Sequence, residues 1–490
     1  MELNFGYVDG LPPEEHEKLA ELKEIYDYHK SSNRTKRRYY NGKITLGEVN
    51  LGIALPHGFS RLEVGCAWGA KTVDVLAARS MFDGFVSQNG ADAAEMNDII
   101  QRNHLIAEYT KACKEELKYG SAFAAVSGEP GNAKIRFYSP HSAAALWDGQ
   151  KGRIGCGFAF EDARKDESDV TWSPEHVNFY TDTDIWQLDR TGGRWEATRF
   201  PHSFGCPLMV PLVWDATSDK PFGQSRLKEP VRRLIQGYVR TVANATIGLE
   251  FATSPQKYLL GVTDEQYDQL VDEKFKQYVG SVLLGTANPE TGEKPTFGQL
   301  SQGSIEPHVQ MLRMLATQYS AATGLTVTDT GVINDANPTS SEAILAQSQS
   351  LILMAEQLNK SNGDALYQIS QMALAIEYGA TPDELPDDEK GIVAHFKNPA
   401  MPSVAETADA AIKIASAREG FASTDIFLEM IGFDQSDIRR IKAQEQRAKG
   451  EQILLEEFGN ADNGEDVESV HQPNVENQSD SGGQDAGMGE

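Results

Sequence analysis

The segment of this sequence that comes closest to a ligand-binding motif is Gly65-Cys66-Ala67-Trp68-Gly69-Ala70-Lys71-Thr72. Glycines followed by Lys and Thr are typical of a phosphate-binding loop, in which backbone amides and the lysine converge on nucleotide phosphates. Such a loop needs four residues between its glycines and a contiguous Gly-Lys-Ser/Thr. Here both the spacing and the register differ, so we expect no ATP site at this segment.

The other residue types that could do chemistry are scattered along the chain. The four cysteines, Cys66, Cys113, Cys156 and Cys206, form no Cys-x-x-Cys pair, which argues against a zinc knuckle or a redox dithiol. We interpret them as buried, reduced thiols. The ten histidines show no metal-ligand spacing, and carboxylates lie in solvated stretches such as Asp383–Glu389. The residues therefore predict no catalytic, cofactor-binding or metal-binding site.

Length and composition indicate a globular protein with two to four sub-domains, since 490 residues exceed a single compact core. The N-terminal residues Met1–Phe5 lack a basic region and an apolar run, so we expect no secretory signal. No apolar stretch is long enough to span a bilayer. We expect a soluble protein that stays in the cytoplasm where it is made.

The formal net charge of −27 bears on the kind of nucleic-acid contact that the protein can make. It argues against a sequence-specific DNA-binding protein, which clamps phosphates with Lys and Arg. It is compatible with a conduit along which DNA slides without adhering. Solubility is the competing explanation, because ten of the acidic residues lie between Glu456 and Glu490.

The first 220 residues read as one α+β domain. An amphipathic helix opens at Glu14 and is expected to end near Ser31-Ser32-Asn33. A basic cluster, Arg34–Arg38, follows, and it could contact nucleic acid or an acidic neighbouring subunit. A second helix is predicted over Asp92–Leu117. From Ala122 to Trp214 the hydrophobic period is two, which predicts strands, including a hairpin around Gly192-Gly193.

Two helices enclosing a small lobe follow this domain. The first helix starts at Leu227 with Pro230 in its first turn, and about 26 residues of helix would span roughly 39 Å. The second is expected over Ile305–Ala322. Between them, four pieces are predicted: strands at Lys257–Leu260 and Ser281–Leu284, a helix at Asp264–Tyr278 and an extended segment at Pro295–Leu300.

The last third of the sequence begins with a polar loop, Gly324–Pro338, that cannot be helical throughout. Thr339-Ser340-Ser341-Glu342 is a capping box that should open a long helix with apolar runs at Ile344–Met354 and Leu366–Ile376. A strand at Ile392–Phe396 and helices from Ser403 to Phe458 come next. The remainder, Gly459–Glu490, has a composition typical of disorder.

Five short motifs accompany this order of elements over nearly the whole chain: Arg37-Arg38-Tyr39-Tyr40-Asn41-Gly42, Gly205-Cys206-Pro207-Leu208-Met209-Val210-Pro211, Phe222-Gly223-Gln224-Ser225, Phe297-Gly298-Gln299-Leu300 and Asn337-Pro338-Thr339-Ser340-Ser341-Glu342-Ala343. In this order, the elements and motifs resemble those of the portal proteins of tailed bacteriophages, specifically the branch with long non-contractile tails.

The resemblance implies a mainly helical α+β fold with the architecture of a portal subunit. The parts it implies are an α+β wing (1–222), stem helix 1 (223–251), a small α/β clip (252–304), stem helix 2 (305–323), a tunnel loop (324–338), a long wing helix with its following strand (339–399), crown helices (400–458) and a disordered acidic tail (459–490).

The resemblance also implies the function of a non-enzymatic channel for double-stranded DNA in a capsid vertex, built as a ring of usually twelve subunits. The tunnel loop would face DNA with Thr326, Thr328, Asp329, Asn334 and Asp335. The clip would dock the terminase large subunit and the head-completion adaptor with Asp264, Asp268, Asp272 and Lys276. The major capsid and scaffolding proteins would be further partners, and no cofactor or metal is implied.

Two other classes of protein stay open at this stage. A minor structural protein of the capsid or tail would lack a ring with a through-channel. A nucleic-acid-processing enzyme of a phage would need a metal-binding cluster of carboxylates.

Overall fold

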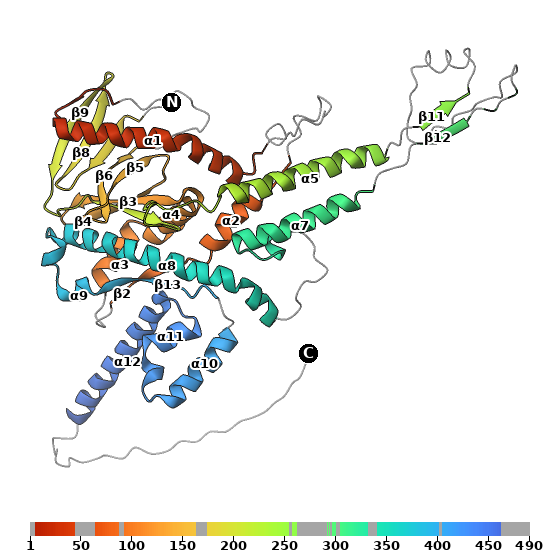
Figure 1. The fold of residues 1–490 in the computed structure, drawn as a ribbon. Coiled ribbons are helices and arrows are strands. Elements are labelled where there is room, and N and C mark those ends of the chain that lie inside the picture. Colours follow the sequence, from red (N-terminus) through yellow and green to blue (C-terminus); the bar gives the residue numbers. More distant parts are fainter. Residues whose placement is uncertain are drawn as a thin grey trace, which may run out of the picture. The chain divides into compact units, whose positions relative to one another are not determined.

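The computed structural model describes residues 5–44, 64–87, 93–162, 174–253, 257–261, 292, 294, 296–299, 304–331, 341–400 and 404–461 (Figure 1). The chain divides into two compact units, Met1–Ser403 and Val404–Glu490. The first unit combines helices with four sheets, and the second is helical, so the predicted α+β class is confirmed. No helix in these described ranges is both long and apolar enough to cross a membrane.

The first helix, α1 (Pro13–Tyr40), continues through the basic cluster, so the prediction that it ends near Ser31-Ser32-Asn33 was wrong. Polar residues are tolerated there because they find partners inside the helix and beyond it. The Thr35 hydroxyl donates to the Ser31 carbonyl at 3.1 Å, and Lys36 Nζ donates to the Tyr119 carbonyl at 2.9 Å. The basic residues in the last turn also interact favourably with the helix dipole.

A six-stranded sheet lies against α1 and follows the predicted β-rich block. Its order is β1-β9-β8-β7-β6-β5, and all neighbours are antiparallel except β1 and β9. The strands are β1 (Val8–Asp9), β5 (Ala143–Asp148), β6 (Arg153–Phe160), β7 (His176–Tyr180), β8 (Asp184–Thr191) and β9 (Arg194–Pro201). The hairpin predicted at Gly192-Gly193 joins β8 to β9. Leu19 and Leu22 of α1 are buried with Phe158 in the core beneath this sheet.

A three-stranded sheet, β10-β3-β4, forms the centre of the larger core. It consists of β3 (Ser121–Glu129), β4 (Asn132–Tyr138) and β10 (Met209–Val213), and helices α4 and α8 pack against it. The single helix predicted over Asp92–Leu117 is in fact two, α3 (Ala94–Arg102) and α4 (Leu105–Tyr119). The helix breaks because the Asn103 side chain binds strand β4, accepting from the Ile135 amide at 2.9 Å.

Helix α8 (Ser341–Tyr378) joins both predicted apolar runs into one continuous helix. The polar triplet Ser361-Asn362-Gly363 lies inside it, with Asn362 fully buried. Residues 339–340 of the predicted capping box lie outside the described residues. After the 3-10 turn η4 (Pro382–Glu384) and α9 (Asp387–Lys390), the predicted strand β13 (Ile392–Phe396) pairs with β2 (Phe82–Ser87).

Two long helices, α5 (Glu229–Thr253) and α7 (Glu306–Thr323), pack side by side as Figure 1 shows. Both were predicted, and Pro230 occupies the first turn of α5 as expected. Beyond them, β11 (Lys257–Leu260) pairs antiparallel with β12 (Thr296–Gln299), which confirms two of the extended pieces predicted for the lobe. The predicted helix Asp264–Tyr278 and strand Ser281–Leu284 lie outside the described residues.

The second unit contains α10 (Val404–Ala417), the 3-10 turn η5 (Phe421–Ser423), α11 (Asp425–Ile431) and α12 (Gln435–Ala461). These are the helices predicted from Ser403 to Phe458, with α12 reaching slightly further. The Thr424 hydroxyl caps α11 by accepting from the Phe427 amide at 3.3 Å. The predicted disordered tail lies outside the described residues from 462 onward.

Candidate functional site

The segment around Trp68, which is similar to a phosphate-binding loop, lies at a buried junction between the long helices α5 and α7 and the loop that follows α7. Trp68 begins helix α2 (Trp68–Ala77) and is 3% exposed. Its ring centroid lies 4.4 Å from that of Tyr238 in α5 and 4.5 Å from that of Tyr319 in α7. Its indole N–H donates to the Thr330 carbonyl at 2.9 Å. One side chain therefore ties both long helices to the loop that follows α7.

Hydroxyl groups in this junction bind each other and the backbone of α2. The Tyr319 hydroxyl donates to the Trp68 carbonyl at 2.8 Å and also contacts the Thr72 hydroxyl. Burial raises the pKa of Tyr319 well above its usual range. Lys71 is exposed, and a Cβ at Gly69 would overlap the Tyr39 carbonyl oxygen, because α1 ends against the first turn of α2. The glycine here permits close packing of two helices, and the lysine is exposed to solvent.

A buried arginine fastens the end of α7 to α2. Arg226 Nε donates to the Thr72 carbonyl at 2.7 Å, and its Nη2 donates to the Thr323 carbonyl at 2.6 Å. Its guanidinium carbon lies 5.6 Å from the centroid of the Trp214 ring. Burial lowers the pKa of Arg226 to about 10. A cation at the C-terminal end of a helix interacts favourably with the unpaired carbonyls there.

The motif Phe222-Gly223-Gln224-Ser225 precedes Arg226 and positions its side chain in the junction. Gly223 has a φ of +68°, and a Cβ would overlap the Trp214 carbonyl oxygen, so only glycine fits. The Ser225 hydroxyl donates to the Lys118 carbonyl at 2.6 Å and accepts from the Leu227 amide at 2.9 Å, which fixes the entry to α5. The motif was noted from the sequence, but the arginine that follows it was missed.

The described part of the predicted tunnel loop, residues 324–331, is folded onto the body. Thr328–Thr330 form the 3-10 turn η3. The Asp329 carboxylate accepts from the Thr326 amide at 2.9 Å and from its hydroxyl at 2.8 Å, and Leu325 is buried. Thr328 is exposed. Asp329 therefore stabilises its own loop, and Asn334 and Asp335 lie outside the described residues.

The helix pair extends from this junction to the β11–β12 strands (Figure 1). Gly237 of α5 faces Leu315 of α7, and a Cβ there would lie 3.2 Å from Leu315 Cδ2. Leu249, Met311 and Met314 on the two helices stay exposed. The clip residues predicted to dock partners, Asp264, Asp268, Asp272 and Lys276, lie outside the described residues.

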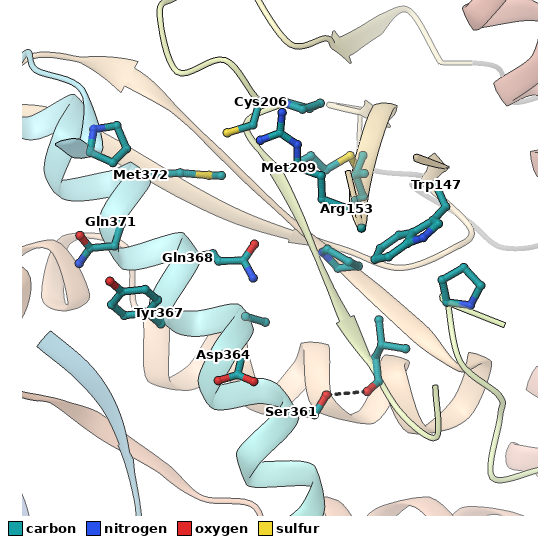
Figure 2. A pocket seen from close by; sticks show the side chains of 18 of the residues that line it. Trp147, Arg153, Cys206, Met209, Ser361, Asp364, Tyr367, Gln368, Gln371 and Met372 are labelled. Atoms are coloured by element: carbon teal, nitrogen blue, oxygen red, sulfur yellow. Dashed lines mark hydrogen bonds between the residues drawn. The ribbon is translucent and has the colours of Figure 1, made fainter. Parts of the chain in front are cut away.

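A separate pocket of about 570 Å³ lies between α8 and strand β10. Figure 2 shows Asp364, Gln368 and Gln371 along α8 and Met209 on the opposite side, with Cys206 beside Arg153. Burial raises the pKa of the Cys206 thiol, which disfavours the nucleophilic thiolate. Within the described ranges, no group of three or more His, Cys, Asp or Glu side chains is placed to hold a metal ion.

Together these features define an α+β body from which a braced pair of long helices extends. The chain belongs to the family described as "Phage portal protein, SPP1 Gp6-like", which matches residues 19–451. This confirms the resemblance drawn from the sequence motifs, and at the level of the family the role is structural and not enzymatic.

Solved structures to which the chain is similar come from gene transfer agent particles. "Neck of native GTA particle computed with C12 symmetry" is 16% identical, covers 75% of this chain and 90% of that chain, and has a TM-score of 0.45. "Virion of native gene transfer agent (GTA) particle" is 16% identical, covers 75% of this chain and 89% of that chain, and has a TM-score of 0.44. No curated protein was found to match in sequence.

Proposed function

We propose that this chain is the subunit of a portal ring, the channel at one capsid vertex through which double-stranded DNA is packaged and ejected. Membership of the portal family supports the proposal. The ring contains twelve subunits, as the family resemblance implies, and it resides in the virion. Residues 1–222 and 339–399 form the wing, 223–251 and 305–323 the stem, 252–304 the clip, 324–338 the tunnel loop and 400–458 the crown.

The observation that carries this proposal is the braced helix pair. At one end, Trp68 and Arg226 hold α7 and the loop after it to the body through buried hydrogen bonds, and the Trp68 ring packs against Tyr238 of α5. At the other end, the pair leads to the β11–β12 strands. A helix pair held in this way is rigid. Rigidity suits a stem that keeps a docking lobe and a channel loop in a fixed position relative to each other.

Exposed apolar side chains support assembly into a ring. In the second unit, Ile412 is 61% exposed and Ile453 is 58% exposed, while Ala411 and Ile438 are its buried apolar residues among those described. Met311 and Met314 are exposed on one side of α7. A contiguous patch of exposed apolar side chains is typical of a contact with another chain. A ring buries it because each subunit meets two neighbours through two different faces.

The charge of the chain suits a non-adhesive DNA channel. With a net charge of −27, a subunit as a whole repels phosphates, so DNA would pass without a specific grip. The clip would dock the terminase large subunit during packaging and the head-completion adaptor afterwards. The wing would face the major capsid and scaffolding proteins.

Negative-stain microscopy of the purified protein, combined with native mass spectrometry, tests the proposal. We expect rings with a central hole and a mass of about twelve subunits. Monomers or filaments without a channel would instead favour a minor structural protein of the particle. ATP turnover by the pure protein that Lys71→Ala abolishes would favour an enzyme and contradict the proposed role.

A further inference from the structure

A second pocket, of about 810 Å³, collects basic side chains where α1 meets the start of α5. Helix α1 contributes His29 and Lys36, and α5 contributes Arg232. Lys220 and Lys228, from the segment that leads into α5, complete the set of cations. The pocket therefore gathers positive charge in a protein whose overall charge is strongly negative.

Two of these cations have no acidic partner within the described parts of the chain. Lys36 Nζ donates to the Tyr119 carbonyl at 2.9 Å and to the Asn33 side-chain oxygen at 3.4 Å, both of which are neutral acceptors. The Arg232 guanidinium lies 5.9 Å from the centroid of the Tyr39 ring. Neither forms an ion pair with a described carboxylate.

Two acids, one lining this pocket and one beside it, are already engaged. Asp215 pairs with Lys228 at 2.5 Å, and Glu229, which also lines the pocket, pairs with Arg233 at 3.0 Å. Burial and the charge of Arg232 lower the pKa of Lys36 to about 8, and burial followed by the charge of Lys36 lowers the pKa of His29. An anion placed between Lys36 and Arg232 would relieve their mutual repulsion.

We propose that this pocket binds a carboxylate side chain from an adjacent copy of the same chain. The inference rests on the proposed ring, in which one face of each subunit must complement a different face of its neighbour. A subunit with 72 acidic and 45 basic residues offers many carboxylates, so the charges are complementary. The pocket walls include Phe123 and Phe222, which suit a single inserted side chain better than a hydrated phosphate backbone.

A zero-length carbodiimide crosslink tests this contact directly on the wild-type protein. Rings assembled from equal amounts of ¹⁴N- and ¹⁵N-labelled subunits are crosslinked, digested and analysed by mass spectrometry. We expect a peptide containing Lys36 joined to an acidic peptide of the other isotope, which identifies the carboxylate. Links found only within one isotope, or no link at Lys36, would overturn the inference.

Variants give a second, quantitative test. Lys36→Gln with Arg232→Gln should raise the subunit concentration for half-assembly by about tenfold, because a buried ion pair is lost. Lys111→Gln is the control, since its partner Glu108 belongs to its own chain and neither residue lines the pocket. Lys36→Arg should keep assembly close to wild type. If the double variant does not fold, as judged by circular dichroism, the crosslink alone decides.

Other results separate this inference from the proposed function. If the wild-type protein forms no ring, the result contradicts the proposed function itself. If wild type and the double variant assemble equally well, the ring stands and the carboxylate contact is rejected. Binding to a short fluorescent DNA duplex is measured in parallel. A loss of DNA binding with intact rings would assign the pocket to phosphate instead of to a neighbouring subunit.

Discussion

Glu116 in α4 is a carboxyl group buried completely in the larger core. One of its oxygens accepts from the Asn362 side chain of α8 at 2.9 Å, and the same amide donates to the Tyr109 hydroxyl at 2.9 Å. Burial raises the pKa of Glu116 to about 8, and the bond from Asn362 offsets only part of that shift. The core therefore holds this carboxyl in its protonated form at neutral pH.

This arrangement predicts that stability falls as the pH rises. The pKa in the folded state lies above the unfolded value, so the contribution is full below about pH 4.5 and is lost as the pH rises toward 8. The slope is at most about 1.4 kcal/mol per pH unit. Glu116→Gln should flatten this dependence and raise the melting temperature at pH 8, measured by calorimetry. Glu108→Gln, whose side chain pairs with the exposed Lys111 on the same helix, is the control and should keep the wild-type slope.

The indole N–H of Trp68 is expected to hold the loop after α7 in place. Trp68→Phe keeps an aromatic ring between Tyr238 and Tyr319 but leaves the Thr330 carbonyl without its donor. The loss should cost roughly 1–3 kcal/mol of unfolding free energy. Amide hydrogen exchange in residues 324–331 should become faster. Tyr319→Phe should lower stability without that local opening, and equal exchange in both variants would contradict the role of the indole.

The exposed residue Thr328, in the loop after α7, allows a direct test of a DNA-facing role. Asp329 is unsuitable for charge reversal because it holds the loop together through Thr326. Thr328 is exposed, so Thr328→Lys adds positive charge without removing those bonds. Attraction to phosphate should slow DNA and shorten the packaged length, with partial recovery at higher salt. Thr328→Gln is the neutral control, and normal packaging by the lysine variant would remove the loop from the DNA path.

The proposed clip gives a prediction that concerns partners. Asp268→Lys with Asp272→Lys should weaken binding of the terminase large subunit, measured by interferometry, because charge complementarity at a docking surface is lost. Rings should still form. Asp387→Lys with Asp388→Lys makes the same change in charge at exposed positions of α9 and should leave binding unchanged. Failure of ring assembly in the clip variant would place this segment between subunits.

Local patterns predicted most elements, and contacts between distant segments explain the errors. Period-two hydrophobicity and Gly192-Gly193 indicated the β8–β9 hairpin, and apolar spacing indicated α5 and α7. The end of α1 was placed too early because Lys36 finds its partner at Tyr119. The break between α3 and α4 was missed because Asn103 binds strand β4. Neither contact can be read from neighbouring residues.

The same reason explains what was missed at the candidate site. The segment around Trp68 was not predicted to bind ATP, and its role as a junction depends on residues far away in the sequence. Arg226 follows a recognisable motif, yet its acceptors are the carbonyls of Thr72 and Thr323. Buried polar contacts of this kind have no sequence period, so they appear only once the elements are packed.

The acidic tail is expected to affect the assembly of the ring but not the folding of the subunit. Residues 462–490 contain eight acidic residues and no Lys or Arg, and α12 ends before them at Ala461. A segment so poor in apolar side chains buries little surface, so truncation after Ala461 should leave the melting temperature nearly unchanged. A loss of several degrees would show that the tail packs on the body.

Removing these charges from every subunit should also reduce repulsion around the ring, so the truncated protein should assemble at lower ionic strength than the full chain. Mass photometry across a salt series measures this shift, and assembly that needs the same or more salt would show that the tail does not oppose ring closure.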